Sequence, residues 1–331
     1  MTICLLCALN PDNRGIMGIV KPAARLFVLL ALKAPIGVIF RRGLSNQVLL
    51  IKWDLDRDTF EFGQWLKGRV YERRCDISPT GDLLLYFASD SRRAFSSWSA
   101  ISRPPYFSAI AIWPKGNTFG GGGIFSSQSE VLLDRQPWEV TEVPDGFSIP
   151  KWLTVGRMDR HSWEEFDPSS PWSKRLNRDG WTMTAYPDKT KDEFGAEMAL
   201  EFDPPITWQK ANPRYPEAYT LQMSILGLGG KNGPSIVIEY SVVGKYGDVE
   251  MIGRSEWAEW SHDGDLLFAQ SGCLFRLRCQ NRKLGFIEES EQLADFTHLE
   301  FHRLEPPEDA FLWPRRGKQK GPNSESHIQS R

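Results

Sequence analysis

Residues 259–277 read EWSHDGDLLFAQSGCLFRL, and an earlier stretch, residues 75–88, reads CDISPTGDLLLYFA. The two stretches align without a gap from Ser78 and Ser261 onward, so that in each a Gly-Asp pair precedes a run of large apolar residues. Glycine tolerates the positive φ of tight turns, and Asp-Gly is a strong hairpin signal. We therefore predict two hairpins, and we assign a structural role to their turn residues Gly81, Asp82, Asp263 and Gly264.

The paired motif, S-P-x-G-x-L-L in one copy and W-S-x-D-G-x-L-L-F-A in the other, resembles the blade motif of WD40-like and TolB-like β-propellers. The overall pattern is also similar to that of an uncharacterised bacterial family. This resemblance covers two short stretches and implies a fold in which a strand, a turn and a second strand recur in each blade. Blades of about 40 to 50 residues would place the two copies four repeats apart.

The chain between and around these copies divides into short apolar or alternating runs separated by turn signals, which is typical of all-β proteins. Residues 25–40 suggest two buried strands broken at residues 33–35, and residues 157–179 suggest inserted loops or a short helix. We predict an all-β, propeller-like domain of five or six blades over residues 20–313. Residues 1–19 are then a poorly specified leader, and residues 314–331 a disordered basic tail. Further strands are expected at 36–40, 47–53, 59–62, 69–77, 83–87, 105–113, 124–125, 130–133, 181–186, 197–202, 219–226 and 235–243.

Composition supports this fold and limits the partners. The chain contains 13 Trp, 19 Phe and 8 Tyr, residues that suit pleated and half-buried surfaces. Its net charge of -2 provides no chain-wide positive field, so we expect no binding to nucleic acid or to an anionic membrane. We expect an unknown protein or small ligand as the partner and a monomeric chain.

Location follows from the cysteines and from the first apolar segment. Five irregularly spaced cysteines fit reduced thiols in the cytoplasm better than a disulfide framework. Lys33 and Pro35 interrupt the apolar run 25–40, so we expect no membrane span. If translation starts at Met17, the same run imitates a signal peptide, although a small-residue cleavage site is poorly supplied.

Two patterns could suggest a metal site. Cys4 and Cys7 have the spacing of a zinc knuckle, but no second pair with that spacing occurs. His298 and His302 lie four residues apart, but without the glutamate of a zinc protease motif and without a long helical pattern. We predict no metal site and no cofactor.

Signals for other common chemistries are also weak. Residues 227–233 lack a Ser or Thr after Lys231 and lead into a predicted strand, so they do not fit a phosphate-binding loop. The four glycines at 120–123 could form an anion nest or let the chain pass close to a neighbouring blade. No G-x-S-x-G motif for a serine nucleophile occurs.

The densest group of polar and aromatic residues lies in the segment 157–179, where a solvated loop is the alternative to a ligand site. We predict a non-catalytic binding or scaffolding module that uses a propeller face, with a small-ligand sensor as a related possibility. The alternative is a hydrolase acting on a glycan or peptide, with acids converging on the central channel; acids around a water-filled channel would favour it, and an apolar plug would disfavour it. The candidate ligand-binding residues are Asp159, His161, Trp163, Glu164, Asp167 and Trp172.

Overall fold

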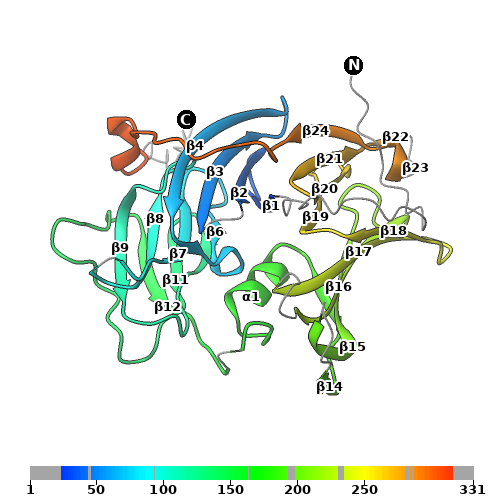
Figure 1. The fold of residues 1–331 in the computed structure, drawn as a ribbon, viewed down its shortest axis with the longest axis horizontal. Helices are drawn as coiled ribbons and strands as arrows, with labels where there is room; N and C mark the ends of the chain where they lie inside the picture. Colours follow the sequence, from blue (N-terminus) through cyan, green and yellow to red (C-terminus); the bar gives the residue numbers. More distant parts are fainter. Residues whose placement is uncertain are drawn as a thin grey trace, which may run out of the picture.

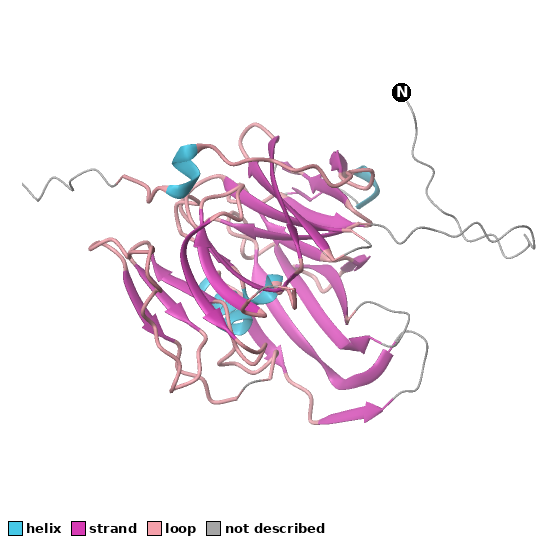
Figure 2. Cartoon of the chain, turned by 60° about the vertical axis from the view of Figure 1, so that its left-hand side comes forward, coloured by secondary structure: helices cyan, strands magenta, loops and turns pink. Residues whose placement is uncertain are grey.

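The computed structural model describes residues 24–315, except 44–45, 93, 163, 193–197, 230–234, 281–282 and 285–286. The predicted leader and residues 316–331 of the predicted tail lie outside this range. Strands joined by loops form most of the described chain, and its helices are short (Figure 2). No helix in the described part is long and apolar enough to cross a membrane.

Five sheets follow one another along the chain and are arranged as a five-blade propeller (Figure 1). The predicted all-β class is confirmed, and five is one of the two expected blade numbers. Blade 1 contains β1 (Arg25–Leu30), β2 (Ile36–Arg42), β3 (Gln47–Asp54) and β4 (Thr59–Lys67). Blade 2 contains β5 (Arg69–Val70), β6 (Asp76–Ile77), β7 (Leu84–Ser89), β8 (Ser97–Ser102) and β9 (Ala109–Lys115). Blade 3 contains β10 (Gly123–Ser127), β11 (Glu130–Leu133) and β12 (Thr154–Arg157).

The second half of the chain forms the two remaining blades. Blade 4 contains β13 (Thr182–Ala185), β14 (Lys189–Asp192), β15 (Met198–Ala211), β16 (Tyr219–Gly229), β17 (Ile236–Gly244) and β18 (Val249–Arg254). Blade 5 contains β19 (Trp257–Trp260), β20 (Leu266–Gln270), β21 (Cys273–Leu277) and β24 (Glu291–Asp295). Outside the blades lie α1 (Pro171–Arg178), the small pair β22 (Cys279–Gln280) and β23 (Lys283–Leu284), and the 3-10 helices η1 (Glu72–Arg74), η2 (Ile287–Glu289) and η3 (Glu308–Phe311). Among the described strands, pairing is antiparallel except between β11 and β12, which run parallel.

The two motif copies form equivalent hairpins, β6–β7 in blade 2 and β19–β20 in blade 5. In the first, the Ser78 hydroxyl accepts from the amide of Leu83, and in the second the Ser261 hydroxyl accepts from the amide of Asp265. Gly81 and Gly264 have φ values of +76° and +84°. A side chain strains this backbone region, which explains why glycine occurs in both copies.

Two details differ from the prediction. The motif copies lie three blades apart rather than four, because blade 4 alone extends from Thr182 to Arg254. The expected continuous strand 69–77 is interrupted by η1, so that β5 and β6 pair one after the other with the same strand, β7. The interruption places Arg73 in η1, where it lines a cavity, rather than on a sheet face.

Apolar residues alternate along the strands and bury the two faces of a blade against different neighbours. On β1, Val28 packs into the core between blades 1 and 5, whereas Leu29 packs into the core between blades 1 and 2. Tryptophans occupy these interfaces: Trp53 lies between blades 1 and 5, Trp98 between blades 1 and 2, and Trp113 between blades 2 and 3. Blade 4 packs against blade 5 through a further core.

Helix α1 lies between blades 3 and 4, within the ring (Figure 1). It begins with an N-cap at Ser170 and a proline at its first position, both favourable starts, and Gly180 follows it with φ +91°. Trp172 and Leu176 join the core of blades 4 and 5. Arg178 donates to the Asp76 carboxylate of blade 2, with Nη2 3.0 Å from Oδ1, and to the carbonyl of Phe125 in blade 3, so it holds α1 against blades 2 and 3.

Candidate functional site

A cavity of about 260 Å³, named the central channel below, lies between four of the blades and helix α1. It is lined by β1, by η1 and β6, by α1, by β17 and by β19, and therefore by residues from blades 1, 2, 4 and 5. Its aromatic lining consists of Phe27, Trp172, Trp181, Tyr240, Trp257 and Trp260. Aromatic walls with a few polar groups are typical of small-ligand sites, and this volume is slightly below the ~300 Å³ at which such sites usually start.

A second cavity of about 170 Å³ adjoins the channel. Phe27, Arg73, Ile238 and Glu256 line both cavities, so these four residues lie where the two meet. The second cavity adds a charged lining of Arg25, Arg42, Glu72 and Arg254. The channel thus has an aromatic lining, and the adjoining second cavity has a lining rich in arginine.

Most acids of the channel are held in ion pairs. Asp76 is fully buried and pairs with Arg178, whose side chain also bonds Asp179 at 2.8 Å. Glu259 accepts from Lys210 at 2.9 Å and from the Trp181 indole at 2.9 Å. These carboxylates stabilise the local structure and are not available as free bases.

Arg73 is different, because it makes no hydrogen bond or ion pair with any described residue. Its buried Nε has no partner. Its guanidinium lies over the Trp172 ring, 5.0 Å from the ring centre, which fixes its position by a cation–π contact. A buried donor without a partner costs free energy unless water or a ligand satisfies it. Arg73 is therefore placed to donate to a bound molecule.

Glu256, which precedes β19, is the acid without an ion pair at this junction. Burial raises the pKa of its carboxyl to about 7, and nearby Arg25 acts in the opposite direction. Its buried Oε2 has no hydrogen-bond partner. Near neutral pH this group therefore changes between a neutral donor and a charged acceptor.

Two arginines affect the pKa of the Tyr240 phenol. Burial raises the pKa of its phenol, whereas Arg73 and Arg175 act in the opposite direction. Arg175 is itself buried, donates to the carbonyl of Cys75 and lies over the Phe27 ring at 5.5 Å. Burial lowers the pKa of its guanidinium. Arg73, Arg175 and Tyr240 thus face a common region of the channel.

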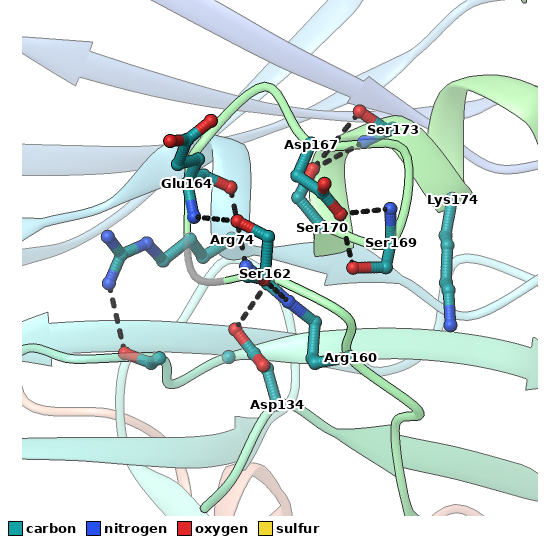
Figure 3. Close-up of polar contacts among 12 residues, drawn as sticks. Arg74, Asp134, Arg160, Ser162, Glu164, Asp167, Ser169, Ser170, Ser173 and Lys174 are labelled. Atoms are coloured by element: carbon teal, nitrogen blue, oxygen red, sulfur yellow. Dashed lines mark hydrogen bonds and ion pairs between the residues drawn. The ribbon is translucent and has the colours of Figure 1, made fainter.

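The loop of segment 157–179, for which the sequence predicts a ligand site, is held to blade 3 by an ion pair (Figure 3). Arg160 forms a buried ion pair with Asp134 at 3.0 Å and donates to the carbonyl oxygens of Ser162 and Glu164. The carboxylate of Asp167 accepts from the amide of Ser169 at 2.8 Å. These contacts order the loop internally.

The predicted ligand residues that the structure describes lie in two different surroundings, an exposed loop and the channel. Asp159 and His161 lie 4.0 Å apart with side chains that are 85% and 79% exposed, and Glu164 is exposed as well. Trp163 lies outside the described residues. Trp172 lines the channel, where the Arg73 guanidinium lies over its ring, and it also contacts Phe166 of the loop with ring centres 5.7 Å apart.

The remaining sequence patterns are the histidine pair, the cysteine pair and the run of four glycines. His298 and His302 are exposed loop residues, and no group of three or more His, Cys, Asp or Glu able to hold a metal occurs among the described residues. Cys4 and Cys7 lie outside the described range. The 120–123 glycines pass close to blade 2: a Cβ on Gly121 would lie 2.3 Å from Phe87, and one on Gly122 would lie 1.9 Å from the Arg74 carbonyl oxygen. The amide of Gly122 donates to Ser99 at 2.8 Å.

Comparison with known proteins adds no activity. No protein-family model matches the sequence, and neither does any curated protein. Among solved structures, the chain is similar to the uncharacterized protein lmo1340 from Listeria monocytogenes EGD-e, with 11% sequence identity and a TM-score of 0.30. That similarity covers 86% of this chain and 87% of the other.

Sequence reasoning missed Arg73, Arg175, Tyr240 and Glu256. Arg73 was placed within a continuous strand, where it would point to solvent or to a neighbour. The one available signal was the pair of adjacent arginines Arg73-Arg74 directly before the buried Cys75, at a point where the alternation of the strand fails. The position of Glu256 at the channel follows from blade closure, which sequence spacing does not reveal.

Proposed function

We propose that this protein is a non-catalytic binding module whose central channel accepts a small ligand. The observation that carries the proposal is the cavity of about 260 Å³, which combines aromatic walls with two buried polar atoms that have no partner, Arg73 Nε and Glu256 Oε2. An apolar plug would have left no room for a ligand. Buried polar groups normally have partners, so these two mark where a ligand or ordered water contributes contacts.

We also propose that the propeller is WD40-like or TolB-like. It is supported by the two motif hairpins, with their shared serine cap and glycine turn. The proposal further includes that the protein is bacterial, cytoplasmic and monomeric. It is motivated by the buried thiols of Cys75 and Cys279 and by the resemblance of the motifs.

The test is a thermal-shift screen of metabolite-sized compounds, because a ligand that binds the folded state raises its melting temperature. Phe27→Ala alters the junction of both cavities, whereas Phe119→Ala makes the same chemical change at a surface side chain that is 71% exposed. Ligands of the channel should stabilise the wild type and Phe119→Ala but stabilise Phe27→Ala less. A screen without stabilising compounds, or equal shifts in both variants, would contradict the proposal.

A hydrolase remains the second candidate because Glu256 has a pKa of about 7, which suits a general acid. Against it, glycoside cleavage requires a second available carboxylate, and Asp76 and Glu259 are ion-paired. Incubation with glycan and peptide substrate panels separates the two functions. Turnover that is abolished by Glu256→Gln would support the hydrolase, and absence of turnover would support the binding module.

A further inference from the structure

The charges around the two cavities do not balance. Arg175 and Arg178 offset Asp76 and Asp179. The remaining ion pairs are Arg42–Glu72 at 2.7 Å, Lys210–Glu259 at 2.9 Å and Arg254–Glu239 at 3.7 Å. After these pairs, Arg25 and Arg73 remain against a single acid, Glu256. The site therefore has an excess of one positive charge when Glu256 is ionised and of two when Glu256 is neutral.

The position of Arg73 makes this excess useful for recognition. The guanidinium is held against Trp172, its Nε is buried without a partner, and it lines both cavities. A planar guanidinium matches a carboxylate through two parallel hydrogen bonds, and such bonds strengthen away from bulk water. Trp172, Phe27 and Tyr240 lie around it and would contact an apolar body attached to that carboxylate.

We infer that the channel binds a small organic carboxylate with an apolar or aromatic body, and that Arg73 is the group that binds the carboxylate. The inference rests on the proposed function, because it names the ligand class of the same channel. Arg25, at the smaller cavity, adds attraction at longer range.

Glu256 makes this binding depend on pH. It shares the smaller cavity with the charged groups Arg25, Arg42, Glu72, Arg73 and Arg254. Glu72 is paired with Arg42. On the channel side, Glu256 shares its cavity with further charged or titratable groups: Asp76, Arg175, Asp179, Lys210, Tyr240, Glu259 and His262. Burial raises the pKa of the Glu256 carboxyl to about 7. When ionised it repels a bound carboxylate, and when neutral it does not. At a separation of ~6 Å, the repulsion between two like charges weakens binding about threefold at the dielectric constant of water and about 100-fold at the effective dielectric constant of a protein.

The experiment is isothermal titration calorimetry of the full chain with matched probes: phenylacetate, phenylacetamide and 2-phenylethylamine. Phenylacetate should bind and the neutral and cationic probes should bind at least tenfold more weakly. Arg73→Gln should weaken phenylacetate binding roughly 10- to 100-fold, the usual effect of a hydrogen-bonded charge, and Arg73→Lys should recover part of it. Arg57→Gln removes the same charge at a side chain that is 77% exposed, and it should leave binding unchanged.

The pH arm compares pH 6 and pH 8. Wild-type affinity for phenylacetate should fall at pH 8, whereas Glu256→Gln should bind equally at both. The melting temperature of each variant, compared with that of the wild type, establishes that the variant is folded. Equal binding of phenylacetamide, or of phenylacetate to Arg73→Gln, would overturn the carboxylate assignment while leaving the binding module in place. If all three probes fail but the compound screen finds neutral or cationic channel ligands, the inference also fails; if no compound of any class binds, the proposed function fails with it.

Discussion

Asp76→Asn should strongly destabilise the protein, because Asp76 connects three parts of the ring. Its carboxylate is fully buried, pairs with Arg178 of α1 and accepts from the amide of Phe125 in blade 3 at 2.7 Å. Removing one partner of a buried ion pair typically costs about 3–5 kcal/mol, because the other charge stays buried without compensation. For a chain of this size, each kcal/mol lowers the melting temperature by about 2 °C, so we expect a decrease of roughly 6–10 °C.

Urea unfolding monitored by circular dichroism measures the free energy, and calorimetry measures the melting temperature. The control is Asp54→Asn, which breaks an ion pair with Arg57 whose side chains are 34% and 77% exposed. Exposed pairs contribute about 0–1 kcal/mol, so this variant should resemble the wild type. If Asp76→Asn also loses less than about 1 kcal/mol, the buried ion pair does not close the ring and the reasoning is wrong.

Three further predictions concern the channel, the turns and the thiols. Because burial raises the pKa of Glu256 to about 7, its contribution to stability is complete below pH ~4.5 and is lost as the pH rises through 7. Glu256→Gln should therefore be more stable than the wild type at pH 8, by up to about 3 kcal/mol, and close to it at pH 4. Urea titrations at both pH values measure this difference. Gly264→Ala should lower the free energy of unfolding by about 1–2 kcal/mol, because the φ of Gly264 is +84° and an added Cβ would lie 2.7 Å from Asn212 Oδ1. Gly116→Ala, where an added Cβ would meet no atom within 4 Å, should be nearly neutral in the same unfolding measurement. Burial raises the pKa of the Cys75 thiol, so iodoacetamide should label it only after unfolding, as peptide mass spectrometry would show; rapid labelling of the native protein would contradict this.

The fold could be predicted from local signals because each blade repeats local chemistry. Turn glycines such as Gly81 and Gly264 and the apolar runs that follow them act within one hairpin, so their meaning is visible in the sequence. The spacing of the blades was less accessible. Blade 4 has long strands, and β15 alone covers Met198–Ala211, so an average repeat length gave the wrong separation of the motif copies.

The site could not be predicted to the same extent, because it forms where blades meet. A dense polar segment is visible in sequence, but its contacts, such as Arg160 with Asp134, are used to order the loop. The charged groups of the channel come from η1 and from the residue before β19, which are remote in sequence. Trp172 was selected as an aromatic residue of the loop. Its position at the channel depends on the orientation of α1, which the sequence pattern did not determine.

Ring closure and the proposed binding site share one element. Apolar cores join blade 4 to blade 5, blade 5 to blade 1, blade 1 to blade 2 and blade 2 to blade 3, whereas α1 connects blade 3 to blade 4 with a buried apolar face on one side and Arg178 on the other. The same helix supplies Trp172 and Arg175 to the channel. A ligand that contacts Trp172, Phe27 and Arg73 therefore bridges α1 to blades 1 and 2. Binding in the channel and closure of the ring should stabilise each other, because both depend on α1 remaining in position.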